Sequence, residues 1–351
     1  STGGLSIGEV EREALQLAGD DPAKAVASGL RRQDEFVASR VFYEQRDTLL
    51  ACGQRDSILV FSNDPQKAKY TASFSYLGPK QGHYLLAPAQ TANERVYIWV
   101  APDPITCAPQ GEYAPVIALS TPQQQRMVTV GQQWTPNQNT TLHTEVALSH
   151  YDRNRFSAFE QQHDAGWAAF TQFRKRVLLG KKNAAPEMNL RLSYEAVQRN
   201  FRSLNPYRNP EFLRDWSLAD FQGVGTVQAA NEQIARLEWN LSRAGLGSIS
   251  YGFNTFLREN QYRGTRHDLS GEGNWRGWQL KGLASSLQAD AAGEERRFFR
   301  PQLSVDKVFK KLKNWSLGWT GEGEQNDRYA RAQDSLTGSS FRYFSQRLYL
   351  K

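Results

Sequence analysis

Residues 246–260 read "LGSISYGFNTFLREN", and this stretch decides the fold. Every second residue is large and apolar, with Thr255 as the one interruption: Ile249, Tyr251, Phe253 and Leu257. The residues between them are small or polar: Ser248, Ser250, Gly252 and Asn254. Because successive side chains of a strand point to opposite faces, the stretch predicts a β-strand with one apolar and one polar face.

Similar long segments surround this strand in the second half of the chain. They are "TLHTEVALSHY" (141–151), "GWAAFTQFRKRVLL" (166–179), "MNLRLSYEAVQ" (188–198), "ARLEWNL" (235–241), "WQLKGLASSLQ" (278–288), "WSLGWTGE" (315–322) and "SFRYFSQRLYLK" (340–351). Many reach the roughly 9–11 residues that a tilted strand needs to cross a bilayer. Seven of the nine tryptophans fall in this half, several of them near short turns, where membrane barrels carry aromatic girdles.

The connections between these segments are of two kinds. "SRAG" (242–245) and "NWRG" (274–277) are tight turns. We expect long, charged loops at "RENQYRGTRHD" (258–268), "ADAAGEERRFFRPQ" (289–302) and "GEQNDRYARAQDSLTGSS" (323–340). Short turns at one end and long polar loops at the other are typical of an outer-membrane β-barrel. "HYDRNRF" (150–156) is interpreted as a further loop on the extracellular side.

The chain as a whole predicts an all-β protein in three parts. Residues 1–35 form an N-terminal helical segment, because 7–30 carry the only convincing helical pattern. Residues 36–135 contain short apolar runs bounded by Gly, Pro, Asn or Asp, which predicts a soluble β-sandwich-like domain. After a polar linker, "GQQWTPNQNTT" (131–141), residues 136–351 form an antiparallel meander and an incomplete transmembrane β-barrel.

The barrel hypothesis assigns a direction to individual side chains. Five polar residues would face the lumen and line any water path: Arg236, Glu238, Asn254, Gln279 and Lys281. Five apolar or aromatic residues would face lipid or form the girdle: Leu237, Trp239, Tyr251, Phe253 and Trp278. The opposite burial, with the apolar set packed in a core, is what a soluble sheet requires.

Charge is distributed unevenly along the chain. Residues 1–135 have a net charge of −2 and the remainder +9. Such a basic half is compatible with nucleic acid, anionic headgroups or an anion-binding lumen. Since the basic residues alternate singly with apolar ones, we predict no nucleic-acid partner. The sequence has no run of about 20 apolar residues, which a membrane-spanning helix needs.

Motifs for catalysis and for metal binding are missing from the sequence. The five histidines show no HExxH or HxH spacing, and no GxSxG motif is present. We therefore predict no enzyme activity, no metal and no cofactor for this segment. The two cysteines, Cys52 and Cys107, either form one disulfide or remain as buried thiols. If the protein is exported, a bridge would require Cα atoms within about 7 Å of each other.

Four phrases resemble segments of large outer-membrane β-barrel proteins of Bacteroidota-type bacteria: "YLGPKQGHYLLAP" (76–88), "GEYAPVIALSTPQ" (111–123), "TEVALSHYDRNRFS" (144–157) and "LNPYRNPEFLRDWSL" (204–218). The resemblance runs from about residue 35 onward and implies a β-rich soluble region followed by a long barrel. It implies no catalytic residues. Such barrels commonly finish in an aromatic residue, whereas this chain finishes in Lys351. We expect either a truncated barrel or one that other segments complete, and an excerpt of a longer protein.

Two functions follow as hypotheses. The first is an outer-membrane protein with a structural, transport or surface-assembly role, in contact with outer-membrane lipid and with other outer-membrane or periplasmic proteins. The second is a soluble secreted β-protein that binds polysaccharide through aromatic residues, suggested by Trp275 and Trp278. Solubility without detergent distinguishes the two.

Overall fold

The computed structural model describes residues 8–88, 94–180, 185–218, 230–291, 293–309 and 315–350. The chain is mostly β and divides into two compact units. Unit 1 comprises Ser1–Gln124 and Asp152–Gln162, and unit 2 comprises Gln125–Tyr151 and His163–Lys351. Neither of the two α-helices in the described residues, α1 (Glu9–Leu17) and α2 (Phe212–Asp215), has the length and apolar content to cross a membrane.

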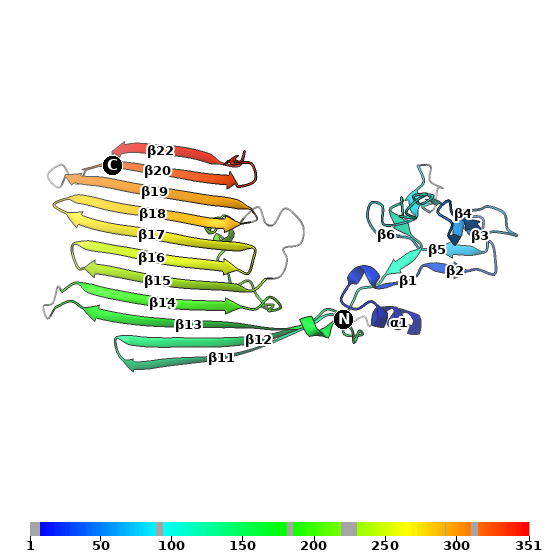
Figure 1. The fold of residues 1–351 in the computed structure, drawn as a ribbon, viewed down its shortest axis with the longest axis horizontal. Helices are drawn as coiled ribbons and strands as arrows, with labels where there is room; N and C mark the ends of the chain where they lie inside the picture. Colours follow the sequence, from blue (N-terminus) through cyan, green and yellow to red (C-terminus); the bar gives the residue numbers. More distant parts are fainter. Residues whose placement is uncertain are drawn as a thin grey trace. The chain divides into compact units, whose positions relative to one another are not determined.

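Unit 1 consists of α1, a short 3-10 helix (Pro22–Lys24) and three small antiparallel sheets (Figure 1). The first sheet pairs β1 (Val26–Ser28) with β10 (Val116–Ala118). The second has the order β2-β5-β3-β4, from β2 (Leu30–Arg32), β5 (Tyr70–Ala72), β3 (Tyr43–Leu49) and β4 (Arg55–Phe61). The third has the order β6-β9-β7-β8, from β6 (Ser75–Tyr76), β9 (Tyr113–Ala114), β7 (Tyr84–Leu86) and β8 (Tyr97–Trp99).

The two four-stranded sheets share one aromatic core. Phe74 stacks on Tyr97 with ring centroids 4.3 Å apart and lies 5.5 Å from Tyr43. Two buried tyrosine hydroxyls also accept hydrogen bonds across the core. Tyr43 accepts from the backbone N–H of Tyr97 at 3.0 Å, and Tyr84 accepts from that of Leu59 at 2.9 Å. Each sheet therefore satisfies a backbone donor of the other.

We predict that Tyr43→Phe destabilises unit 1 by about 1–3 kcal/mol, because the buried Tyr97 N–H loses its acceptor. Burial raises the pKa of Tyr43 to about 12, so the fold favours the neutral phenol. The resulting stabilisation is complete below pH 10 and is lost as the pH rises from about 10 to about 12. Tyr43→Phe should therefore also reduce the alkaline loss of stability. Hydrogen exchange of peptides from β3 and β4 between pH 7 and 11 measures both effects, with the exposed Tyr76→Phe as control. An equal effect of the two variants would contradict the prediction.

Unit 2 is one 12-stranded antiparallel sheet in which β11 to β21 follow each other in sequence order and β22 pairs with β20 (Figure 1). The strands are β11 (Gln124–Asn137), β12 (Thr140–Asp152), β13 (Ala165–Leu178), β14 (Glu187–Val197), β15 (Glu232–Arg243), β16 (Gly247–Arg258), β17 (Tyr262–Trp275), β18 (Trp278–Ala291), β19 (Glu294–Phe309), β20 (Trp315–Ala330), β21 (Ser335–Leu336) and β22 (Phe341–Leu350). The sheet is not closed: among the described residues β11 pairs with β12, β22 pairs with β20, and the two outer strands do not pair. The predicted long antiparallel meander is confirmed. The described strands do not close into a barrel.

The register of the strands defines two faces of the sheet. We call the side of β16 with Ile249, Tyr251 and Phe253 the apolar face and the side with Ser250, Gly252 and Asn254 the polar face. Residues directly opposite each other in neighbouring strands share a face, so the pairings of β14 to β19 extend these faces across the sheet. Burial agrees with this division on β16: Ile249 is 42% exposed, whereas Asn254 is 4% exposed.

Two predictions for the first 141 residues were wrong. Residues 26–32 were assigned to a helical segment, but they form β1 and β2, which pair with β10 and β5. Their backbone pairs with strands distant in sequence, which the local helical pattern does not reveal. The expected linker 131–141 is a β-hairpin instead, formed by the end of β11 and the start of β12. The structural boundary consequently lies at Gln124/Gln125, earlier than the predicted 135/136.

The predicted long loops are also shorter than expected. Most of 258–268 lies in β17, and only Glu259–Gln261 connect it to β16. Most of 289–302 lies in β18 and β19, and 323–330 continue β20. Charged residues stand on both faces at these strand ends, which removes the apolar alternation that would have identified a strand. Residues 150–156 were interpreted as a loop on the extracellular side, but β12 continues to Asp152. The following residues belong to unit 1, where the Asn154 side chain donates to the carbonyls of Leu15 and Gly19 at 2.7 and 2.8 Å.

Candidate functional site

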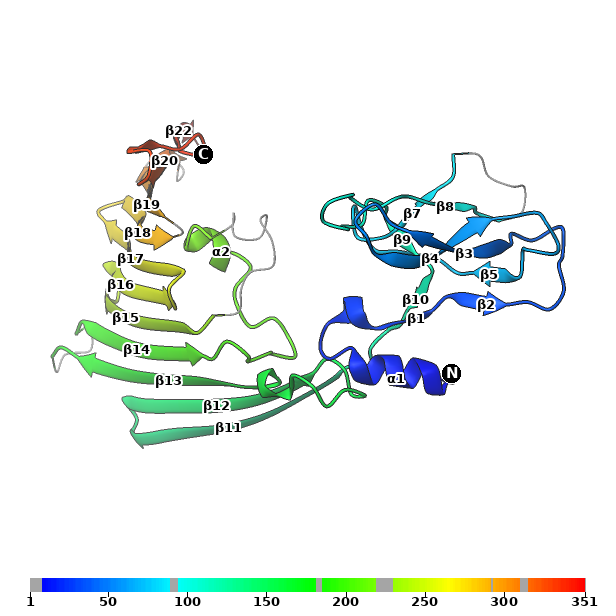
Figure 2. The same ribbon diagram turned by 45° about the vertical axis from the view of Figure 1, so that its right-hand side comes forward.

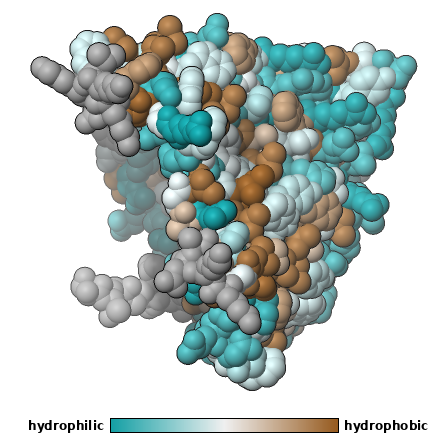
Figure 3. Space-filling view, turned by 90° about the vertical axis from the view of Figure 1, so that its left-hand side faces the viewer, coloured by the Kyte–Doolittle hydropathy of each residue, from teal (hydrophilic) through white to brown (hydrophobic). Residues whose placement is uncertain are grey.

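Large apolar side chains stand exposed along the apolar face over most of the sheet. From β14 to β22 they are Leu192, Tyr194, Ile249, Leu257, Leu269, Trp275, Trp278, Leu280, Phe299, Leu303, Phe309, Trp315, Leu317, Phe344, Leu348 and Leu350. We call this set the apolar belt. Figure 3 faces the end of the sheet that carries the turns 244–246 and 276–277, and hydrophobic residues gather in the middle of that view. A monomeric soluble protein rarely leaves so large an apolar surface in water.

The belt ends where charged residues begin on the same face. Along β19 it runs from Phe309 to Phe299, and the next residues on that face are Arg297 and Glu295. Lys307 is the one charged residue inside this stretch. Its ammonium lies 4.8 Å from the Trp278 ring and donates to the Arg276 carbonyl in the turn. This side chain therefore directs its charge toward the turn end of the sheet.

The polar face carries a folded-back segment of the β14–β15 connection. Residues 199–218, which we call the in-folded segment, include α2 and lie against this face (Figure 2). Trp216 and Leu218 pack with buried residues of five strands: Ile234, Phe256, Tyr262, Leu287, Ala289, Ala291 and Phe298. The Tyr262 hydroxyl also donates to the Trp216 carbonyl at 2.7 Å. A small hydrophobic core thus fixes the in-folded segment to the sheet.

Ion pairs around this small core also hold the in-folded segment against the sheet. Arg208 contacts Glu195 at 2.8 Å and Glu232 at 2.7 Å, with its guanidinium 4.4 Å from the Phe212 ring. Arg266 of β17 contacts Asp215 of α2 at 3.2 Å. These charges are mostly screened from solvent, so they hold the segment in one position more firmly than exposed pairs would.

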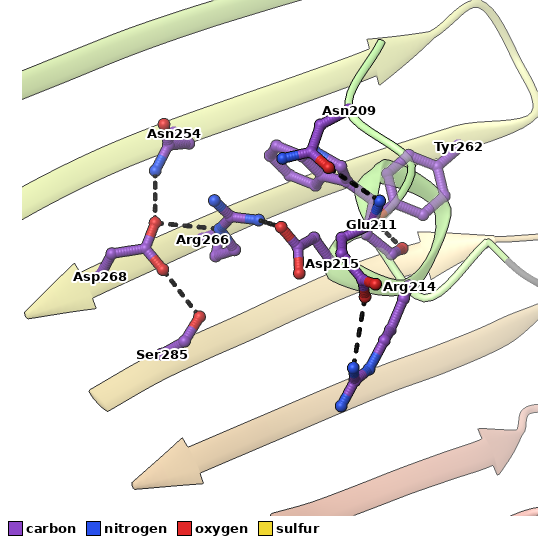
Figure 4. Close-up of polar contacts among 10 residues, drawn as sticks. Asn209, Glu211, Arg214, Asp215, Asn254, Tyr262, Arg266, Asp268 and Ser285 are labelled. Carbon is purple, nitrogen blue, oxygen red and sulfur yellow. Dashed lines mark hydrogen bonds and ion pairs between the residues drawn. The ribbon is translucent and has the colours of Figure 1, made fainter. Parts of the chain in front are cut away.

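Asp268 connects this contact to the neighbouring strands (Figure 4). Its carboxylate accepts hydrogen bonds from Asn254 of β16 at 2.8 Å, from Arg266 at 3.0 Å and from Ser285 of β18 at 2.8 Å. The polar side chains of three strands therefore form one network, and the network continues through Arg266 into α2.

Beside the network lies a recess of about 790 Å³. Its lining on the polar face comes from β12 to β17, and α2 contributes from the in-folded segment. Gly252 stands between Glu238 and Asp268 in the register, and without a side chain it leaves the floor of the recess open. Five basic lining residues lie on the polar face, Arg174, Arg176, Arg191, Arg236 and Arg266, and the acidic lining residues are Asp215, Glu238 and Asp268.

The ten side chains assigned from the sequence divide between the faces. The register puts Arg236, Glu238, Asn254, Gln279 and Lys281 on the polar face, and Leu237, Trp239, Tyr251, Phe253 and Trp278 on the apolar face. Arg236, Glu238 and Asn254 meet at the recess, whereas Gln279 and Lys281 lie on β18 outside it. None of the apolar five belongs to a buried core cluster of the described residues.

Sequence reasoning missed the residues that hold the in-folded segment. Phe256 belongs to the polar set of 246–260 by its position, yet it is 0% exposed. A large aromatic residue in an otherwise small and polar set was the available signal that something covers this end of the face. Trp216, Arg266 and Asp268 could not be brought together from sequence, because their contact depends on a long connection folding back.

Cys52 and Cys107 form a disulfide with Cα atoms 5.6 Å apart, which agrees with the predicted limit. Cys52 lies in the turn between β3 and β4, and Cys107 lies in the connection between β8 and β9. The bond therefore joins the two four-stranded sheets of unit 1.

Within the described parts of the chain, no three His, Cys, Asp or Glu side chains are placed to hold a metal ion together. In comparisons with known proteins, no family model matches the chain and no curated protein is similar enough to count as a relative. The resemblance to large outer-membrane barrel proteins consequently rests on the four quoted phrases alone.

Proposed function

We propose that unit 2 forms part of the wall of an outer-membrane β-barrel, with the apolar face toward lipid and the polar face toward the lumen. In this proposal the protein has a structural, transport or surface-assembly role and this segment carries no catalysis. The observation that carries the proposal is the apolar belt, which lies opposite a face with a partly buried polar network.

The dimensions of the belt support this assignment. From Phe309 to Phe299 the strand advances ten residues, and at about 3.4 Å per residue and a tilt of about 40° this spans about 25 Å. That is the height of the apolar band of outer-membrane barrels. Trp275, Trp278 and Trp315 stand exposed at the turn end, where an aromatic girdle would lie.

Unit 1 supports an exported location. Disulfides persist in oxidising compartments and are rare in the cytosol. The Cys52–Cys107 bond joins two sheets of the same domain, so we assign it a structural role. We propose that unit 1 is an extracytoplasmic domain carried by the barrel, where it is available to outer-membrane or periplasmic proteins.

Two arginine substitutions test the direction of the faces. Leu303 on the apolar face and Leu283 on the polar face are 44% and 45% exposed, and they lie on adjacent strands. In a bilayer Leu303→Arg should cost about 2–4 kcal/mol, because the charge enters hydrocarbon. Leu283→Arg should cost far less, because its charge stays in the aqueous lumen.

Full-length protein carrying each change is expressed, and its recovery from washed outer membranes is compared with wild type. We expect a strong loss for Leu303→Arg only. Equal recovery of both variants, or wild-type protein that stays soluble without detergent, would refute the membrane assignment. That result would favour the secreted polysaccharide binder, for which the exposed Trp275–Trp278 pair is the supporting observation.

A further inference from the structure

We propose that the recess on the polar face binds the oxyanion of a small, hydroxyl-rich solute, a sugar acid or a sugar phosphate. The proposal concerns a binding site and goes beyond the proposed membrane role, since the site is formed by the polar face itself.

Two arginines of neighbouring strands face each other at the recess. Arg174 of β13 stands directly opposite Arg191 of β14 in the register. Like charges in such a pair repel, because their Cβ atoms are only about 4.5–5.5 Å apart. Glu238 neutralises Arg191 at 2.9 Å, whereas no carboxylate of the described residues neutralises Arg174.

Carboxylates compensate only some of these charges. Arg191 pairs with Glu238 at 2.9 Å, and Arg176 pairs with Glu187. Arg174 bonds the neutral amide of Gln172, and among the described residues Arg236 contacts no carboxylate. Two guanidinium groups therefore remain available at one recess.

These two arginines are close enough to share a ligand. Arg174 and Arg236 lie two strands apart and two residues apart along the strands, since Arg174 pairs with Arg191 and Arg236 with Ser193. Strand spacing of about 4.8 Å and a rise of about 3.4 Å per residue put their Cα atoms about 12 Å apart. Both side chains are long enough to converge on an oxyanion between them, and guanidinium groups bind carboxylate and phosphate with two parallel hydrogen bonds.

The remaining lining indicates what carries the oxyanion. Asn189, Asn240 and Ser250 offer neutral donors and acceptors next to the arginines. A volume of about 790 Å³ is much larger than a single phosphate and falls within the range of small-molecule sites. Amides and a hydroxyl beside a cationic centre fit an anionic sugar.

Calorimetry on the full chain in detergent micelles tests the site with three probes: digalacturonate, glucose 6-phosphate and the neutral disaccharide maltose. We expect the anionic probes to bind, more weakly as salt is added, and maltose not to bind. Arg236→Gln should weaken binding by about tenfold or more, the effect of one lost charge-assisted hydrogen bond. Arg347→Gln, on the same face but outside the recess, should have no effect.

Glu238→Gln provides a test whose expected result, tighter binding, misfolding of the variant would not produce. It removes the carboxylate that occupies Arg191, so affinity for the anionic probes should rise. Tighter binding by Glu238→Gln together with weaker binding by Arg236→Gln supports the site. Unchanged affinity in both variants, or maltose binding as tightly as digalacturonate, overturns it. Preference for one anionic probe identifies the carboxylate or the phosphate as the group recognised.

Discussion

Replacing Phe256 with alanine is expected to destabilise unit 2 by about 3–5 kcal/mol and to release the in-folded segment from the polar face. The Phe256 ring is fully buried and lies 5.4 Å from Phe212, 5.4 Å from Trp216 and 5.3 Å from Tyr262. Its removal leaves a cavity between the sheet and α2, and neither the strands nor the short helix can close over it without losing the ion pairs around them.

Urea unfolding of the protein in micelles, followed by circular dichroism, measures the loss of stability. Release of the segment is measured by trypsin cleavage after Arg208, whose side chain is only 18% exposed while its ion pairs to Glu195 and Glu232 are intact. Phe253→Ala is the matched control, because Phe253 is the preceding phenylalanine on the same strand and faces the other side. A similar loss of stability in both variants would mean that the core under α2 is not what holds the segment.

The two faces of the sheet could be predicted from sequence, because a strand with different surroundings on its two faces must alternate apolar and polar residues. The rule holds for Tyr251 and Phe253 on one side and Gly252 and Asn254 on the other, and the register extends it across β15 to β18. It fails at the ends of the strands. Arg263 and Arg266 lie on opposite faces of β17, so a charged residue occurs on each face and the segment looked like a loop.

The recess and the in-folded segment could be predicted only in part. Arg236, Glu238 and Asn254 were identified because they belong to the polar set of their own strands. Asp268, the partner of Asn254, was not identifiable because it fell in an expected loop, and Asp215, the partner of Arg266, lies in a long connection. Closure of the sheet into a barrel also cannot be predicted from the alternation of apolar and polar residues, because closure depends on which strands pair at the two edges of the sheet.

Unit 1 should lose about 4 kcal/mol of stability when the Cys52–Cys107 disulfide is removed. The bond closes a loop of 55 residues, and in the chain-entropy model a loop of that length restricts the unfolded chain by about this amount. The effect should be confined to unit 1, because both cysteines lie in it and the bond joins its two four-stranded sheets.

Hydrogen exchange of the Cys52→Ala/Cys107→Ala double variant measures this prediction peptide by peptide. Exchange should accelerate strongly in β3, β4 and β7, whose side chains share the aromatic core, while β15 and β16 serve as the internal control and stay unchanged. Alanine at both positions avoids leaving free thiols that could form new bonds. If the small sheets keep their protection, the shared core alone holds them together. The tyrosine hydroxyls of Tyr43 and Tyr84 would then be the more important cross-sheet contacts.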